Sequence, residues 1–168
     1  MHAIHVSIEG LAVLQRGMEQ APEMTRNALL YAMTEATMLT ERETRELMPR
    51  VSGLTAASIE SDAFATPVGV VGTVGSPLPS ALFIELGTRP HMPPVDALIP
   101  WVRAALGVEP TREREVAWLV ARKIAKHGTK AQKPFERAAQ AVSGQVARIF
   151  ETACSLVAEQ IATTRGAA

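Results

Sequence analysis

The stretch from Glu23 to Leu47 constrains the fold more than any other part of this 168-residue chain. It contains no glycine or proline, and most of its residues are strong helix formers. Pro49 follows, and proline disfavours helical geometry at the residue before it. We therefore expect one long helix that ends near Leu47. The apolar side chains close to one stripe of this helix are Leu29, Met33, Ala36 and Leu47.

Residues 52–79 have a different character, because β-branched side chains and glycines are frequent there. This composition predicts a hairpin or a meander. Residues 81–86 form a further short apolar run, for which a strand and a short helix both stay open, since a period cannot be read over so few positions. Near the N-terminus, residues 4–8 alternate apolar and polar side chains and predict a half-buried strand, and a short helical pattern follows at about 11–18.

The C-terminal half is predicted to be helical. Residues 95–106 have a helical apolar period that ends at Gly107, and Thr111 opens another helix that Gly128 stops. That second helix has acids in its first turn and bases in its last, as the helix dipole favours. Pro134 starts a long helix, and residues 163–168 are expected to form a frayed tail. The apolar stripe of the long helix is Val142, Val146, Ile149, Ala153, Val157 and Ile161.

Together these segments predict a single α+β domain over residues 1–168. A small antiparallel sheet would be packed by the long helix of the N-terminal half and the long C-terminal helix, with a two-helix insertion at about 95–127. The chain has only four Phe, two Trp and one Tyr. Its core must therefore be built mainly from Ala, Val, Leu, Ile and Met.

Charge is distributed unevenly although the formal net charge is zero. Residues 1–62 carry nine acids against five bases, whereas residues 112–133 carry seven bases against two acids. Such polarity suits a molecule with two different neighbours, and ordinary solvated faces of opposite sign would give the same pattern. The sequence shows no secretion signal and no membrane-spanning run of about 18 apolar residues, so we expect a soluble protein that is not exported by itself and has no membrane contact.

No residue pattern predicts an enzyme, so we expect no catalytic residues, no cofactor and no metal. Cys154 has no local group to activate it, and the four histidines do not converge on one point. The glycines of "GVVGTVG" lack the Gly-Lys-Ser/Thr ending of a phosphate-binding loop. Glu85 and Asp96 could form an acid/base pair, but no substrate-holding group accompanies them.

The basic segment "ARKIAKHGTKAQKPFER" has the strongest claim to a ligand, because clustered Lys and Arg can neutralise phosphates. No base-reading motif accompanies these residues, and we interpret Trp118 as a packing residue. Non-specific DNA contact, an acidic partner protein and a solvated helix end all stay open. The candidate contact residues are Arg122, Lys126, Lys130 and Lys133.

The order of several sequence motifs resembles the order found in the phage neck and tail-completion protein family. This family is typified by gene product ten of lambdoid siphophages and is related to the minor tail protein Z of phage lambda. The motifs are "ETRELMPRVSGLTAASI", then "FIELGTRPHMPPVDALIPWVR", then "GTKAQKPFERA". Compact members of that family pass from Gly-Thr almost directly to Pro-Phe, whereas this chain inserts residues 95–127. The residues that carry the resemblance are Pro49, Gly53, Leu54, Ser58, Ile59, Glu85, Gly87, Thr88, Arg89, Pro134 and Phe135.

This resemblance implies a structural virion protein without enzymatic activity, made in the cytoplasm of the bacterial host. It would form a homo-oligomeric ring, with a hexamer favoured, at the head-proximal end of the tail for tail completion and head-tail joining. Its partners would be tail terminator or tail tube proteins and head-completion proteins. A DNA-contacting channel module of the neck, a non-virion tail assembly factor and a small morphogenetic hydrolase are the alternatives. The residues expected at the oligomer or partner interface are Glu85, Gly87, Thr88, Arg89, Pro90 and His91.

Overall fold

The computed structural model describes residues 22–50 and 52–166 of the chain. The strand expected at 4–8 and the helix expected at 11–18 lie outside these described residues. The single domain expected from the sequence stays a prediction, and contacts group the chain into two compact units. We call them the sheet unit, which comprises described residues 22–47, 59–77 and 135–166, and the helical unit, which comprises residues 48–58 and 78–134.

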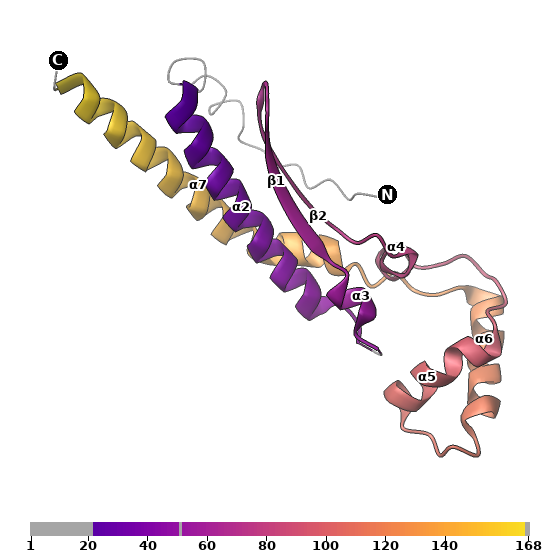
Figure 1. The fold of residues 1–168 in the computed structure, drawn as a ribbon. Helices are drawn as coiled ribbons and strands as arrows, with labels where there is room; N and C mark the ends of the chain where they lie inside the picture. Colours follow the sequence, from indigo (N-terminus) through magenta and orange to yellow (C-terminus); the bar gives the residue numbers. More distant parts are fainter. Residues whose placement is uncertain (1–21, 51, 167–168) are drawn as a thin grey trace. The chain divides into compact units, whose positions relative to one another are not determined.

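The sheet unit combines two long helices with one β-hairpin. Helix α2 spans Pro22–Leu47 and helix α7 spans Pro134–Gly166. Strands β1 (Glu60–Thr66) and β2 (Gly69–Gly75) pair in antiparallel fashion, and α2 runs along them (Figure 1). The predicted long helix, the hairpin and the C-terminal helix are all confirmed, and the fold class is α+β. Helix α7 continues to Gly166, whereas the sequence predicted fraying from Thr163.

The core of the sheet unit is aliphatic, as the small number of aromatic residues led us to expect. Two clusters of buried side chains form it, and Phe150 of α7 packs against both. Adding a Cβ to Gly72 of β2 would place that atom 2.4 Å from Cγ2 of Thr37 on α2, so only glycine fits there without movement. The buried members of the clusters are Leu29, Met33 and Val70 in one, and Ala36, Val142 and Val146 in the other.

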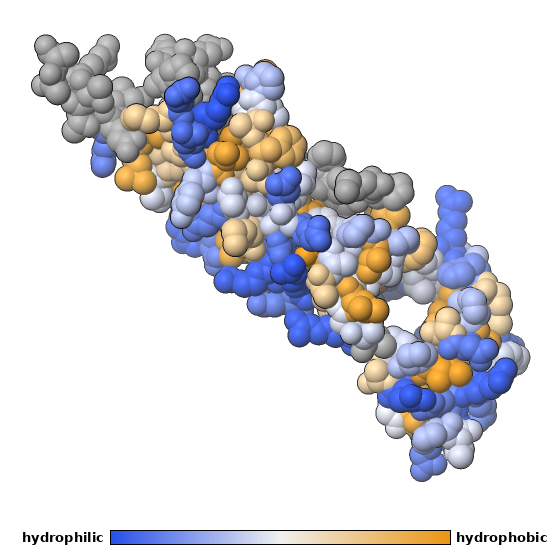
Figure 2. Space-filling view, in the orientation of Figure 1, coloured by the Kyte–Doolittle hydropathy of each residue, from blue (hydrophilic) through white to orange (hydrophobic). Residues whose placement is uncertain are grey.

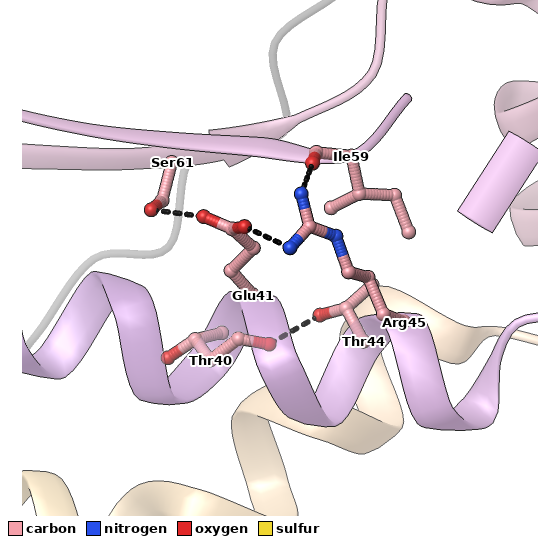
Figure 3. A network of polar contacts seen from close by, with 6 residues as sticks. All are labelled: Thr40, Glu41, Thr44, Arg45, Ile59 and Ser61. Carbon is pink, nitrogen blue, oxygen red and sulfur yellow. Dashed lines mark hydrogen bonds and ion pairs between the residues drawn. The ribbon is translucent and has the colours of Figure 1, made fainter. Parts of the chain in front are cut away.

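A polar network ties the last turns of α2 to the start of β1 (Figure 3). Arg45 pairs with Glu41 at 2.6 Å and donates a second hydrogen bond of 2.6 Å to the carbonyl of Ile59. Ser61 of β1 donates its hydroxyl to the same Glu41. Arg45 is only partly exposed, which favours its charged hydrogen bonds. These bonds hold Ile59, the residue at which the chain re-enters the sheet unit, against α2.

The helical unit contains α3 (Leu54–Ala57), α4 (Pro79–Leu86), α5 (Val95–Leu106) and α6 (Glu113–His127) (Figure 1). The strand alternative for residues 81–86 is wrong, because they belong to α4. Pro79 lies in the first turn of that helix, where its fixed φ is already helical and its missing N–H is not needed. None of the described helices is long and apolar enough to cross a membrane.

Helices α5 and α6 pack against each other and form the predicted two-helix insertion. Their shared interior is small, since Val102, Ala117 and Ala121 are its fully buried apolar side chains. A bidentate ion pair adds to it: Arg103 of α5 donates hydrogen bonds of 2.7 and 2.9 Å to the two carboxylate oxygens of Glu113 in α6. The insertion therefore depends on one charged pair as well as on a few apolar contacts.

Candidate interaction site

The predicted interface residues 85–91 lie at the end of α4 and in the segment that follows it. Glu85 is buried, with 5% of its surface exposed, so its carboxylate has little surface to offer a neighbouring subunit. The expectation that Glu85 lies at an oligomer or partner interface stays a prediction. Arg89, Pro90 and His91 are exposed, and His91 Nδ1 lies 2.9 Å from the carbonyl oxygen of Arg89.

Gly87 allows the chain to turn and pair with a distant segment. Its φ of 71° lies in a region that side chains disfavour. The next residue, Thr88, forms an isolated antiparallel bridge with Thr129, with N–H to carbonyl distances of 3.2 and 3.1 Å. The two threonine hydroxyls also lie 3.0 Å apart, which adds a side-chain contact to the bridge.

A second glycine stands opposite the first. Gly128 has a φ of 69°, and a Cβ built on it would lie 1.9 Å from the carbonyl oxygen of Thr88. A Cβ on Gly87 would lie 2.4 Å from the carbonyl oxygen of Thr129. Both close neighbours are backbone atoms, which cannot rotate away as a side chain can. We call Gly87, Thr88, Gly128 and Thr129 the glycine clasp.

The clasp brings the two predicted sites together. Arg89 follows Thr88 in the interface segment, and Lys130 follows Thr129 in the basic segment, so both exposed cations lie beside one bridge. Lys126 lies in the last turn of α6, close in sequence to the clasp. Lys133 precedes α7 with a φ of 55°, an uncommon value for a residue other than glycine.

Arg122 belongs to a different surface. Its guanidinium lies over the ring of Trp118, 4.8 Å from the ring centroid, and both residues are on α6. Trp118 was expected to be a packing residue, but 46% of its surface is exposed, and the next residue, Leu119, is 51% exposed. The interior between α5 and α6 is lined by alanines, so the tryptophan stays at its edge.

A third exposed surface lies on α2 and was not predicted from the sequence. Tyr31 is 76% exposed, and Met24 and Met38 stand seven residues before and after it, also exposed. Seven residues are close to two helical turns, so the three side chains share one stripe. The seven-residue spacing of Met24, Tyr31 and Met38 could have revealed this exposed stripe. The buried stripe of the same helix, which includes Leu29 and Met33, gives the stronger apolar pattern in the sequence.

The structure offers little for chemistry among the residues it describes. Cys154 is partly buried, and loss of solvent raises the pKa of its thiol, which disfavours the reactive thiolate. Within residues 22–50 and 52–166, no group of three or more His, Cys, Asp or Glu side chains is placed to hold a metal ion. The candidate binding features among the described residues are the clasp with its cations and the exposed aromatic surfaces of α2 and α6.

No protein-family model, curated protein or solved structure matches this chain. The features that bear on function are accordingly the order of the sequence motifs and the exposed surfaces described above.

Proposed function

We propose that this chain is a structural protein of a tailed bacteriophage virion, made in the host cytoplasm. In this proposal it assembles as a homo-oligomeric ring, with a hexamer favoured, at the head-proximal end of the tail. There it completes the tail and joins it to the head, in contact with tail terminator or tail tube proteins and with head-completion proteins. The chain acts by docking, not by transforming a ligand.

The observation that carries this proposal is the amount of large apolar surface left exposed on both units. Figure 2 shows apolar atoms exposed among polar ones over both units. Scattered single exposures are ordinary, but aromatic side chains on helices are typical of protein interfaces. Tyr31 and Trp118 are such residues, and each has exposed apolar neighbours on its own helix. A protein that works by docking would cover these side chains after assembly.

The phage assignment is supported by the residues that carry the family resemblance. Gly53 precedes α3 with a φ of 77°, and Gly87 ends α4 with a φ of 71°. Both positions favour glycine for its backbone freedom. The segments that contain them thus have a structural reason for their glycines, which is consistent with the proposed resemblance.

The test is self-association followed by detection in particles. Light scattering of the purified chain across a salt series should show an oligomer that weakens as salt rises, since opposite charges on neighbouring copies are screened. Arg89→Ala should weaken assembly, whereas Arg148→Ala on the exposed part of α7 should not. A chain that stays monomeric at every salt concentration, and that is missing from mature particles by mass spectrometry, would contradict the proposal.

A second candidate is DNA contact inside the neck channel, and the clasp is the observation that favours it. Arg89 and Lys130 flank the Thr88–Thr129 bridge, one at each end, and Lys126 is nearby in sequence. Phosphate binding needs such clustered cations. Charge reversal at Lys126, Lys130 and Lys133 should then cause DNA leakage or failed ejection while ring assembly stays intact. Lost assembly with unchanged DNA binding would rule this candidate out.

A further inference from the structure

Strand β2 has an outer edge that pairs with no described strand. The described sheet has two strands, and β1 pairs with one side of β2 from Gly69 to Gly75. Alternate residues of a strand direct their N–H and C=O groups to opposite sides, so half of the backbone groups of β2 point to the other edge. Protein sheets usually block such an edge with charges, proline or a bulge. The sequence of β2, GVVGTVG, has no charge and no proline, and its register with β1 is continuous.

The edge of β1 is protected by charge. Glu60 and Asp62 of this strand are both exposed. A strand added beside β1 would lie next to these two carboxylates, which is the usual way in which an edge is kept from pairing. Of the two edges of the hairpin, that of β2 is therefore the one open to a further strand.

Contacts with α2 fix the direction of β2. Met33 of α2 packs against Val70, which lies near the hairpin turn. Glu41, about two helical turns further on, accepts a hydrogen bond from Ser61, and Ser61 pairs with Val74 at the far end of β2. Helix α2 and strand β2 thus run in the same direction, and α2 begins at the turn end of the hairpin (Figure 1). The residues of β2 on the face towards α2 are Val70, Gly72 and Val74.

The chain before α2 contains a segment that suits this edge in length and in period. Residues 4–8 alternate Ile, Val and Ile with His and Ser, so a strand formed by them would have one apolar face. Antiparallel pairing with β2 would place residue 8 at the turn end, where α2 begins. Residues 9–21 join the two, and a chain of that length reaches about 43 Å when extended. This exceeds the length of β2 itself, which is about 23 Å.

We propose that residues 4–8 occupy the outer edge of β2 in the same chain, as an antiparallel third strand. Their apolar side chains continue the face of the sheet that packs on α2, and His5 and Ser7 point to the other face. A shift by two residues in either direction would carry one apolar side chain past an end of β2. The register is therefore Ile4 opposite Val74, Val6 opposite Gly72 and Ile8 opposite Val70.

This inference goes beyond the proposed function and does not depend on it. A third strand from the same chain satisfies the backbone groups at the edge of β2 and covers them. The hairpin is then closed to strand exchange with a second copy, so assembly must use other surfaces. The connection is short, which gives the segment of the same chain a high effective concentration at this edge.

Disulfide trapping in the full-length chain tests the position of the segment. Cys154→Ser first removes the one native cysteine. His5→Cys with Thr73→Cys then places two thiols on directly opposite residues of adjacent strands, within reach of a disulfide. The matched control is His5→Cys with Asp62→Cys, because Asp62 is the partner of Thr73 on β1. Residue 62 is one strand further away, at about 10 Å, which is too far for a disulfide.

Mild oxidation at high dilution, followed by mass spectrometry, should give an internal disulfide in chains of monomeric mass. It should form at least about tenfold faster with Thr73→Cys than with Asp62→Cys. Equal rates, or no disulfide at residue 73, would overturn the proposal. A disulfide found only between two chains would show that a second copy supplies the strand, and would overturn it as well. A chain that stays monomeric contradicts the proposed function and leaves this test unchanged.

Hydrogen exchange gives a second measurement that needs no cysteine. Val6→Asp places a charge on the face towards α2, so it should speed exchange of the β2 amides about tenfold. Ser7→Asp, on the other face, should leave that exchange near the wild-type rate. If the two variants exchange at the same rate as the wild type, residues 4–8 do not cover β2 and the inference fails.

Discussion

Replacing Gly128 with alanine perturbs the glycine clasp at its tightest point. The φ of 69° and ψ of −162° at this residue belong to a region that is essentially restricted to glycine, and holding alanine there costs about 1–3 kcal/mol. The new Cβ would also lie 1.9 Å from the carbonyl oxygen of Thr88, so the bridge to Thr129 must open. That bridge has two backbone hydrogen bonds, each contributing about 1 kcal/mol net. The sum predicts a loss of roughly 3–5 kcal/mol in the free energy of unfolding.

Urea unfolding followed by tryptophan fluorescence measures this loss of stability in the helical unit, which contains the clasp. Both tryptophans of the chain, Trp101 and Trp118, lie in the helical unit. Gly107→Ala is the matched control, because Gly107 also has a positive φ of 58° but a Cβ there meets no atom within 4 Å. The control should lose only about 1–2 kcal/mol, the usual cost of left-handed geometry. If both variants lose the same free energy, the close approach at Gly128 does not constrain the clasp and the reasoning is refuted.

Two further predictions concern the other contacts that join elements. Hydrogen bonds from Arg103 hold the pKa of Glu113 below its ordinary value of 4.5, so the ionised carboxylate stabilises the helical unit above that pH. Tryptophan fluorescence should show that the helical unit becomes less stable as the pH falls through 4.5 and below. The Glu113→Gln variant should lose most of this pH dependence. Gly72→Ala should destabilise the sheet unit by about 1–3 kcal/mol, because the new Cβ would clash with the side chains of Thr37 and Met33. Thermal unfolding followed by circular dichroism measures the change. An unchanged unfolding midpoint would mean that these two side chains move away at no cost in free energy.

The helices could be predicted from the sequence because proline and glycine mark their ends. Pro49 follows α2, Gly107 follows α5 and Gly128 follows α6, and each acts through backbone geometry that depends on its own residue alone. Residues 81–86 could not be assigned, since so short a run has no measurable period. A remote segment also contacts this helix, because the N–H of Gln132 donates a hydrogen bond of 2.9 Å to the carbonyl of Ile84.

The candidate sites could be predicted only in part, because burial depends on the packing of distant segments. The positive φ of Gly87 is a geometry that its residue type makes available, since only glycine tolerates it freely. The bridge partner of Thr88 is Thr129, which lies 41 residues further along the chain, and nothing local indicates that bridge. Glu85 looked like a surface charge and is buried, whereas Trp118 looked like a core residue and is exposed. In both cases the residue type gave the wrong expectation.

The Thr88–Thr129 bridge joins the two ends of the α5–α6 insertion at a single stem. Because the chain leaves and returns at adjacent points, the intervening segment can lengthen, shorten or be exchanged without separating the residues at its base. Grafting a different helical pair between Arg89 and Gly128 would then give the stem a new surface while leaving its own hydrogen bonds in place.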